Sequence, residues 1–352
     1  MRLENSLYRN DLSEVCRLSL PWEELRGKSL LLTGASGTIG TFLVDVLMQK
    51  NKQDGLNVTI FAVGRSEKNA KRRFECYWEN PLFRFVSHDV NEPWEKDLSP
   101  DYMIHAASNT HPKAYAGDPV GTITSNVFGL YHLLNLAAAC KTQRVLFLSS
   151  VEIYGQNKYG LNSFSEGDMG YIDCNTFRAG YPESKRVAES FCRAYEKKAG
   201  LDSVILRLCR IYGPTMPQGD SKALAQFIKN ALNGEDIVLK SEGTQFFSYC
   251  YVADAVSAIL TALLAGKSGE AYNVADPGSN IALRDLAKLI ADANGVKVVF
   301  ELPTAEEKQG FSVADRAVLN PGKLNALGWR AVTGIEGGVN KTIKILKAVK
   351  EW

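Results

Sequence analysis

The stretch SLLLTGASGTIG, residues 29–40, decides how this chain folds. Its continuous apolar run is typical of a strand that is buried on both faces of a parallel sheet. The run leads directly into a glycine-rich turn, and helical spacing of apolar residues begins within the turn. Such a turn presents backbone N–H groups at a helix N-terminus to a pyrophosphate, and its glycines let the ligand approach the backbone. The predicted dinucleotide contacts are Gly34, Gly37, Thr38, Ile39 and Gly40.

Strand and helix patterns alternate along the chain after this stretch. Alternation of this length predicts an α/β fold with a doubly wound parallel sheet. Beyond about residue 212 the elements become shorter and mixed, which indicates a smaller C-terminal α/β lobe. We expect strands at 57–64, 82–90, 101–107, 144–150, 203–208 and 237–241, and helices at 38–50, 66–78, 119–140, 181–198, 223–234 and 252–266.

Composition narrows the class of protein. The 352 residues include 45% hydrophobic side chains and carry a formal net charge of +2, so a large core can form and a nucleic-acid partner is not favoured. The seven cysteines are scattered without a C-x-x-C pair, which indicates reduced thiols and no metal site. The N-terminal residues lack an apolar signal core, and no apolar run is long enough to cross a bilayer. We therefore expect a cytoplasmic protein without a membrane partner.

A second motif, GYPESKRVAES at 180–190, begins a predicted helix. Positions four apart lie on one helix face, so Tyr181 and Lys185 point the same way. An ammonium beside a phenol favours the phenolate, which makes the pair a proton-transfer device. Ser150 ends the predicted strand at 144–150, and ligands of such sheets bind beyond the carboxyl ends of the strands. We expect Ser150, Tyr181 and Lys185 to face one cleft.

The end of the predicted strand at 57–64 leaves the choice of dinucleotide open. An acidic residue at this position normally bonds the ribose hydroxyls of NAD. Here the chain reads AVGRS, with Arg65 at the position in question. The guanidinium can face a 2′-phosphate of NADP, stack on adenine, or lie in solvent. We expect NAD as the cofactor, with NADP as the alternative.

Taken with these motifs, the chain resembles the extended short-chain dehydrogenases/reductases, in the NAD-dependent epimerase/dehydratase family that acts on nucleotide sugars. The resemblance covers about residues 28–348 and includes TGASGTIG, IHAAS, SSVEIYG, YPESK and RLCRIYGPTM. It implies a Rossmann-type sheet with a substrate lobe. We expect an N-terminal helical extension at 1–27, a dinucleotide-binding domain at 28–211 with about 251–275, and a substrate-binding lobe at 212–250 with 276–352.

The resemblance also implies roles for single residues. Ser150, Tyr181 and Lys185 would be catalytic, with tyrosine as the base for a sugar hydroxyl. Asp89 and Val90 would lie at the adenine end of the cofactor, or Asp89 would only cap a turn. The further cofactor contacts implied are Ala106, Ala107 and Asn126, and Ser108 is implied for the substrate.

Glu152 stands where dehydratases and nucleotide-sugar decarboxylases of the family carry a glutamate. It would act at C5 of an oxidised sugar, or it would simply pair with a nearby cation. Arg178, three residues before the tyrosine, resembles the pattern of UDP-glucuronate decarboxylases.

Other positions depart from the familiar patterns. Val151 replaces the acid that dehydratases use for water loss, and Thr215 replaces an arginine of the decarboxylases. Arg210 stands where asparagine is usual, whereas Phe247 stands where an arginine grips the diphosphate. A phosphate contact would thus have moved from one position to the other. The implied substrate contacts are Arg178, Arg210, Lys222, Gln226 and Arg316.

The expected activity is transient oxidation, at C4, of a nucleotide-diphosphate sugar, with net epimerisation. The alternatives are decarboxylation of a UDP-glucuronate type of substrate, an NADP-dependent reductase of keto-sugar nucleotides, and a nucleotide-binding module without catalysis. Many family members dimerise through the helices expected here at 119–140 and 181–198. We therefore expect a homodimer.

Overall fold

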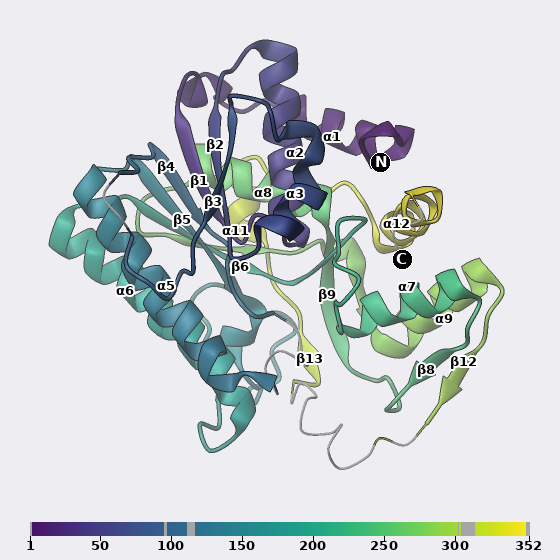
Figure 1. Cartoon of the computed structure of the whole chain (residues 1–352). Coiled ribbons are helices and arrows are strands. Elements are labelled where there is room, and N and C mark those ends of the chain that lie inside the picture. Colours follow the sequence, from purple (N-terminus) through teal and green to yellow (C-terminus); the bar gives the residue numbers. More distant parts are fainter. Residues whose placement is uncertain (1, 95–96, 111–116, 302, 304–313, 350–352) are drawn as a thin grey trace.

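The computed structural model describes the chain apart from residues 1, 95–96, 111–116, 302, 304–313 and 350–352 (Figure 1). Its centre is a seven-stranded sheet with the order β10-β6-β5-β4-β1-β2-β3, in which all neighbours are parallel. This order confirms the predicted doubly wound sheet, because the chain crosses over after β3 and continues on the other side of β1. The strands are β1 (Ser29–Thr33), β2 (Thr59–Gly64), β3 (Phe83–Ser87), β4 (Tyr102–His105), β5 (Arg144–Ser150), β6 (Ser203–Leu208) and β10 (Ala271–Val274).

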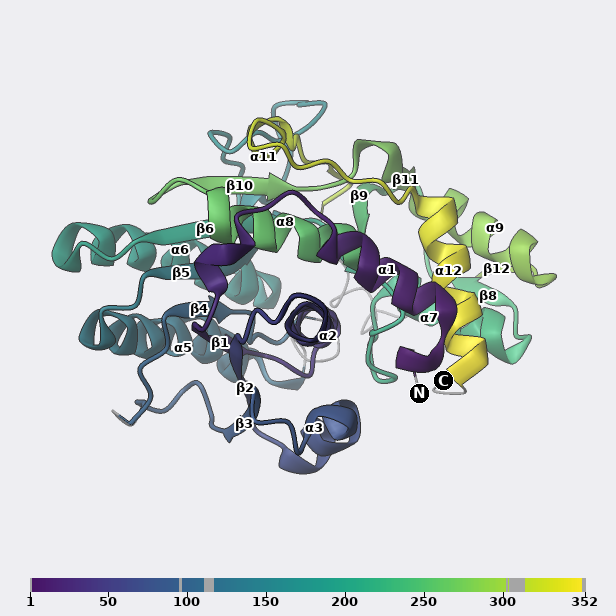
Figure 2. The ribbon, with the colours of Figure 1, turned by 90° about the horizontal axis from the view of Figure 1, so that it is seen from above.

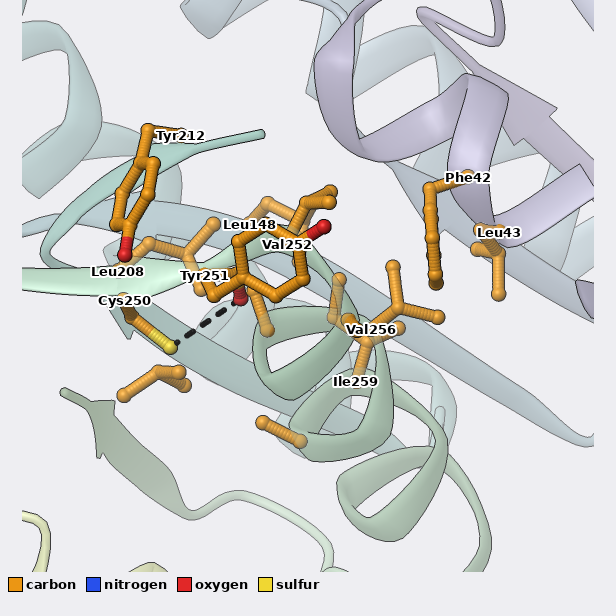
Figure 3. Packing of buried hydrophobic residues seen from close by; sticks show 14 of the residues in the cluster. Phe42, Leu43, Leu148, Leu208, Tyr212, Cys250, Tyr251, Val252, Val256 and Ile259 are labelled. Atoms are coloured by element: carbon orange, nitrogen blue, oxygen red, sulfur yellow. Dashed lines mark hydrogen bonds between the residues drawn. The ribbon is translucent and has the colours of Figure 1, made fainter. Parts of the chain in front are cut away.

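Helices cover both faces of this sheet (Figures 1 and 2). Alternate residues of one strand serve the two faces, since Leu31 packs on one side and Leu30 with Leu32 on the other. In Figure 3, Phe42 and Val256 belong to the helices on the second side. One face carries α5 (Pro119–Cys140) and α6 (Gly180–Ala199); the other carries α2 (Thr38–Asp54), α3 (Glu67–Phe74) and α8 (Val252–Ala265).

The smaller lobe follows the sheet and contains two short sheets. In the first, β9 pairs with β7, β11 and β13, and in the second β8 pairs with β12. Because β7 continues directly from β6, the lobe joins the main sheet at the carboxyl end of the strand next to the edge strand β10. Its elements are β7 (Arg210–Tyr212), α7 (Ala223–Asn233), β8 (Ile237–Leu239), β9 (Phe246–Tyr251), β11 (Asn280–Ala282), α9 (Leu283–Asn294), β12 (Val298–Phe300), β13 (Arg316–Ala317) and α12 (Ile335–Val349), with the short α11 (Gly322–Asn325) packed against β10.

The N-terminal extension folds onto the rest of the molecule as helix α1 (Ser6–Cys16), seen from above in Figure 2. The buried Tyr8 hydroxyl donates a hydrogen bond to Asp45 of α2 at 2.5 Å. The buried Asp11 carboxylate accepts from the Tyr251 hydroxyl at 2.6 Å and from the Lys341 ammonium at 2.7 Å. Helix α1 therefore bridges α2 to the strand β9 and the helix α12, while the division of the chain into domains stays a prediction.

Candidate active site

The phosphate loop lies between β1 and α2 and leaves no space for side chains at two glycines. Gly34 has a φ of +69°, and a Cβ there would lie 2.8 Å from the carbonyl carbon of Ala106. A Cβ on Gly40 would lie 2.5 Å from the carbonyl oxygen of Gly34. A tight glycine turn at a helix N-terminus is the arrangement that binds a pyrophosphate in dinucleotide folds. The loop therefore fits the cofactor that the sequence predicts.

One cavity of about 1270 Å³ runs from this loop to the lobe. It is large enough for a dinucleotide and a second ligand, because pockets for one drug-sized ligand measure about 300–1,000 Å³. Nearly all the predicted site residues line it: Gly34, Gly37, Thr38, Ile39, Gly40, Arg65, Asp89, Val90, Ala106, Ala107, Ser108, Ser150, Glu152, Arg178, Tyr181, Lys185, Arg210, Lys222 and Gln226.

Ser150, Glu152, Tyr181 and Lys185 form one wall of the cavity, here called the catalytic wall. Ser150 is the last residue of β5, and its hydroxyl accepts a hydrogen bond from the N–H of Glu152 at 3.2 Å. Tyr181 and Lys185 lie one turn apart near the start of α6, and the ammonium is 5.9 Å from the centroid of the Tyr181 ring. The helical spacing thus places both groups beside the strand end, although their catalytic roles stay predictions.

Burial changes the acidity of Lys185. Its side chain is 2% exposed, and its ammonium donates to the carbonyl oxygen of Leu148 at 2.8 Å. Loss of solvent lowers the pKa of Lys185 to about 7, and the carboxylate of Glu189 opposes this shift. A lysine with a pKa near 7 can change its charge during a proton transfer at neutral pH.

Glu152 lies between two arginines inside the cavity. Its two carboxylate oxygens are 3.5 Å from Nη2 of Arg178 and 3.6 Å from Nη2 of Arg210. The guanidinium carbon of Arg210 is 3.4 Å from the ring centroid of Phe247 on β9. The structure thus shows the pairing of Glu152 with cations and also its exposure to the cavity. These two guanidinium groups and one carboxylate together leave a net positive charge around Glu152.

Two predicted contacts lie elsewhere. Asn126 is fully buried and outside the residues that line the cavity, and its amide donates to Thr122 and to the hydroxyl of Ser184, both at 3.0 Å. Arg316 is also outside the lining; it donates to the carbonyl oxygen of Asn162 at 3.1 Å and lies over the ring of Phe246. The first fixes helix α5 to α6, and the second joins the lobe to a surface loop.

Three other predicted contacts line the cavity but hold local partners. Asp89 accepts two hydrogen bonds from Asn91 and so closes a local turn. Lys222 pairs with Asp220 at 2.8 Å, and the amide of Gln226 donates to the carbonyl oxygen of Asp220 at 2.6 Å. The lobe side of the cavity is therefore preorganised by Asp220.

Thr215, at the position where the decarboxylases of the family carry an arginine, has a structural role. It is fully buried, and its hydroxyl donates to the carbonyl oxygen of Thr38 at 2.7 Å. Its own carbonyl oxygen accepts from Arg73 of α3. The position after Gly213 and Pro214 thus fastens the lobe to the start of the phosphate-binding helix.

Sequence reasoning missed several cavity residues and a buried ion pair. Lobe residues such as Lys240, Gln245 and Tyr249 reach the cavity from separate parts of the lobe, and no local sequence motif predicts their position. Glu189 pairs with Arg207 behind the catalytic wall. Its position four residues after Lys185 on the same helix face was a signal that could have found it.

The fold and this cavity together define a dinucleotide-dependent enzyme of the Rossmann class. Residues 30–275 match the NAD-dependent epimerase/dehydratase family, so most of the chain is covered. The chain belongs to the NAD-dependent epimerase/dehydratase family, which confirms the family resemblance. NAD as the cofactor is confirmed at the level of the family.

Curated relatives and solved structures agree with this assignment. The chain is 32% identical over 321 residues to UDP-glucuronic acid decarboxylase 1 of Xenopus tropicalis, covering 90% of this chain and 71% of the relative. It is 33% identical over 263 residues to UDP-glucuronic acid decarboxylase 6 of Arabidopsis thaliana, covering 75% and 73%.

A dTDP-glucose 4,6-dehydratase from Streptomyces venezuelae has a similar fold, with a TM-score of 0.79, 24% identity and coverage of 92% of this chain and 98% of that one. The UDP-glucose 4-epimerase of Thermotoga maritima gives a TM-score of 0.77 at 21% identity, with coverage of 92% and 100%. At these identities the likeness shows the fold. In the described part of the chain, no helix is both long and apolar enough to cross a membrane.

Proposed function

We propose that this enzyme modifies a nucleotide-diphosphate sugar by transient oxidation at C4 and that the net reaction is epimerisation. The observation that carries the proposal is the single cavity that joins the phosphate loop, the catalytic wall and the lobe. A cofactor on the loop and a sugar nucleotide against the lobe would then meet at Ser150 and Tyr181.

Each residue of the catalytic wall has a task in this reaction. Tyr181 takes the proton of the sugar hydroxyl, and Ser150 donates a hydrogen bond that orients the reacting oxygen. Lys185 stabilises the phenolate by its charge. When bound, NAD would supply the acceptor for the C4 hydride and then its donor, and return to the opposite face of the sugar would invert C4. Tyr181 would then give its proton back to the C4 oxygen.

The residues around Glu152 separate the possible net reactions. Val151 is buried and cannot donate a proton, which opposes loss of water by the family's usual route. Thr215 is held by Thr38 and supplies no cation to the cavity, which opposes decarboxylation by an arginine at that position. Epimerisation needs neither group, so it is the reaction that fits these positions best.

Decarboxylation is the second candidate, and two observations favour it. Both relatives described above bear the name UDP-glucuronic acid decarboxylase. Arg178 and Arg210 also leave the wall around Glu152 with excess positive charge, which suits a sugar carboxylate. A 4-keto uronate would lose its C6 carboxylate as carbon dioxide, the bonding electrons forming an enolate that is protonated at C5.

Mass spectrometry of the products tests these proposals. The purified enzyme is incubated with UDP-, CDP-, dTDP- and GDP-sugars, with and without added NAD, NADH, NADP or NADPH. Unchanged mass with a new chromatographic peak is the expected result. Loss of carbon dioxide would establish the second candidate, and loss of water would contradict the role assigned to Val151. A change of two hydrogens would indicate the oxidoreductase alternative, and no product from any sugar would oppose catalysis on nucleotide sugars.

We also propose that the enzyme dimerises through α5 and α6. Their outer faces expose large apolar side chains that soluble surfaces seldom gather: Ile123, Phe128 and Tyr131 on α5, and Val187 on α6. Light scattering after gel filtration should give twice the mass of one chain. Phe128→Glu should give monomers, whereas Val332→Glu, at an even more exposed apolar residue after α11, should leave the mass unchanged.

A further inference from the structure

A buried ion pair lies directly behind the catalytic wall. Glu189 is on α6 one turn after Lys185, and Arg207 is on β6, paired in register with Ser149 of β5. The guanidinium holds the carboxylate with two hydrogen bonds, Nε to Oε1 at 3.1 Å and Nη2 to Oε2 at 2.8 Å. The side chain of Arg207 is 6% exposed and that of Glu189 is 12% exposed, and neither residue lines the cavity. The pair therefore lies next to the reacting groups without reaching the substrate.

The carboxylate of the pair holds one end of the segment that carries the catalytic residues. The Ser149 hydroxyl donates to Oε1 of Glu189 at 2.6 Å. Ser149 immediately precedes Ser150, so this bond sets the direction in which β5 presents the next side chain. A shift of Glu189 would be passed directly to the Ser150 hydroxyl.

The guanidinium holds the other end of the same segment. Nη1 of Arg207 donates to the Tyr154 hydroxyl at 2.9 Å, and that hydroxyl donates to Asn273 of β10 at 2.6 Å. Tyr154 is fully buried and ends the short 3-10 turn Val151–Tyr154, which contains Glu152. Ser150 and Glu152 thus lie between two anchors that belong to one ion pair.

The same carboxylate also faces Lys185. Burial lowers the pKa of Lys185, and Glu189 acts against this shift. Two other titratable groups lie near this ammonium, Tyr181 on α6 and His105 on β4. Burial lowers the pKa of His105 to about 3, so His105 is neutral at ordinary pH. Glu189 is therefore the carboxylate that supports the charge of Lys185 from behind.

A buried ion pair adds little to folding stability, because desolvation of both ions offsets their attraction. Its value can instead lie in fixing one arrangement of the groups around it. We propose that Glu189 and Arg207 are positioning residues for the reaction proposed above. They hold the segment 149–154 so that Ser150 and Glu152 face the sugar, and Glu189 lies one helical turn from Lys185 on the same face of α6. This inference rests on the proposed function for its kinetic test.

The first test uses the NAD-bound Glu189→Gln enzyme. The amide can keep the bond from Ser149 but lacks the charge. We expect kcat to fall by about 10–100-fold, the loss typical of small misplacement of reacting groups, with KM changed less than about threefold. The high-pH limb of the pH–rate profile should move to lower pH, and Glu189→Asp should move it back. An unchanged pH profile with only a lower midpoint of thermal unfolding would mean a purely structural role and overturn the proposal.

A second variant is needed if the Glu189→Gln protein does not fold because Arg207 has lost its charged partner. The double substitution Glu189→Gln with Arg207→Met removes both charges from the interior. It should fold and bind NAD, yet show the same fall in kcat and the same shift of the high-pH limb. Wild-type kcat and an unshifted limb in this variant would overturn the proposal.

The chain offers a matched control at the opposite end of the same two strands. Arg144 starts β5 and holds Asp202 with two hydrogen bonds, Nε to Oδ1 at 3.0 Å and Nη2 to Oδ2 at 2.7 Å. Asp202→Asn breaks an ion pair of the same geometry far from the catalytic wall. It should lower thermal stability while kcat and the pH profile stay unchanged. Equal kinetic losses in both variants would show a general effect of destabilisation and contradict the positioning role.

A measurement without turnover separates this inference from the proposed function. The ultraviolet difference between the wild type and Tyr181→Phe reports the Tyr181 phenolate as the pH rises, without any sugar. The same difference in the Glu189→Gln background should appear at higher pH, because Lys185 then carries less charge. An unchanged curve would overturn the inference. If the wild type turns over no sugar nucleotide, the proposed function fails, but this curve still decides the role of Glu189.

Discussion

The cofactor side and the sugar side of the cavity are lined by different kinds of groups. The cofactor side is backbone and small residues, where a Cβ at Gly34 or Gly40 would collide with neighbouring main chain. The sugar side is made of long charged side chains, with Glu152 set between Arg178 and Arg210. A backbone cradle allows few residues at each position, whereas a guanidinium can reach the same point from several positions. The cofactor side can therefore be recognised in a sequence, while the sugar side can be rebuilt from one relative to the next.

Tyr181→Phe should give the largest effect, because Tyr181 is the base that we propose for the reaction, at the point where the two sides meet. Removing the phenol should lower kcat by about 10²–10⁴-fold, the usual contribution of a positioned acid or base. NAD binding, measured by calorimetry, should stay within about twofold of the wild type, since the ring remains.

The control for this variant is Tyr171→Phe, at an exposed tyrosine outside the cavity lining. It should keep full activity. A fully active Tyr181→Phe enzyme would contradict the assignment of Tyr181 as the base.

Gly40→Ala tests the cofactor side. The new Cβ would lie 2.5–2.7 Å from backbone atoms of Gly34 and Ala35, so the loop must shift. We expect NAD affinity to fall by about 10–100-fold, because strained backbone of this kind costs about 1–3 kcal/mol.

Gly337→Ala is the matched control, because a Cβ on this glycine of α12 meets no atom within 4 Å. It should bind NAD like the wild type. Equal NAD affinity in both variants would mean that the glycine loop does not set the cofactor contact.

Arg210→Gln tests the sugar side and should have an effect of similar size to that of Gly40→Ala. One charge-assisted contact to an anionic substrate is lost, worth about 1.5–3 kcal/mol, so KM for a sugar nucleotide should rise by about 10–100-fold. The NAD affinity should not change, in contrast to Gly40→Ala. Arg193→Gln, on the exposed face of α6, should change neither constant. A fall in NAD affinity alone would place Arg210 on the cofactor side.

The pH dependence should show the smallest change. The pKa of Lys185 is about 7, lowered by burial, and only the ammonium supports the Tyr181 phenolate. As pH rises through 7, Lys185 loses its proton, and kcat/KM should bend downward. Lys185→Arg keeps a charge at all these pH values and should move the bend to higher pH. A profile that rises without a bend up to pH 9 would show that Lys185 stays charged in the working enzyme.

The same contrast explains how much of the site the sequence could predict. The alternation of strands and helices, the glycine loop and the pair Tyr181–Lys185 follow from local spacing, and the structure places the loop and the pair on one cavity. The position of Arg210 depends on its contact with the ring of Phe247, which lies 37 residues later on another strand of the small sheet. Arg316 was expected at the substrate but contacts Asn162, since its position depends on how β13 joins β9.

The position of helix α1 between α2, β9 and α12 determines when its contacts can form during synthesis of the chain. The contact between Asp11 and Lys341 spans 330 residues, so α1 leaves the ribosome long before its last partner exists. Contacts of such sequence separation slow folding, and until they form, apolar surface stays open to aggregation. Asp11 is fully buried in the folded molecule, whereas Tyr8 contacts Phe42 of α2, which is made soon afterwards. Helix α1 is therefore made long before its contact with α12 can form, and that contact is among the last to be secured.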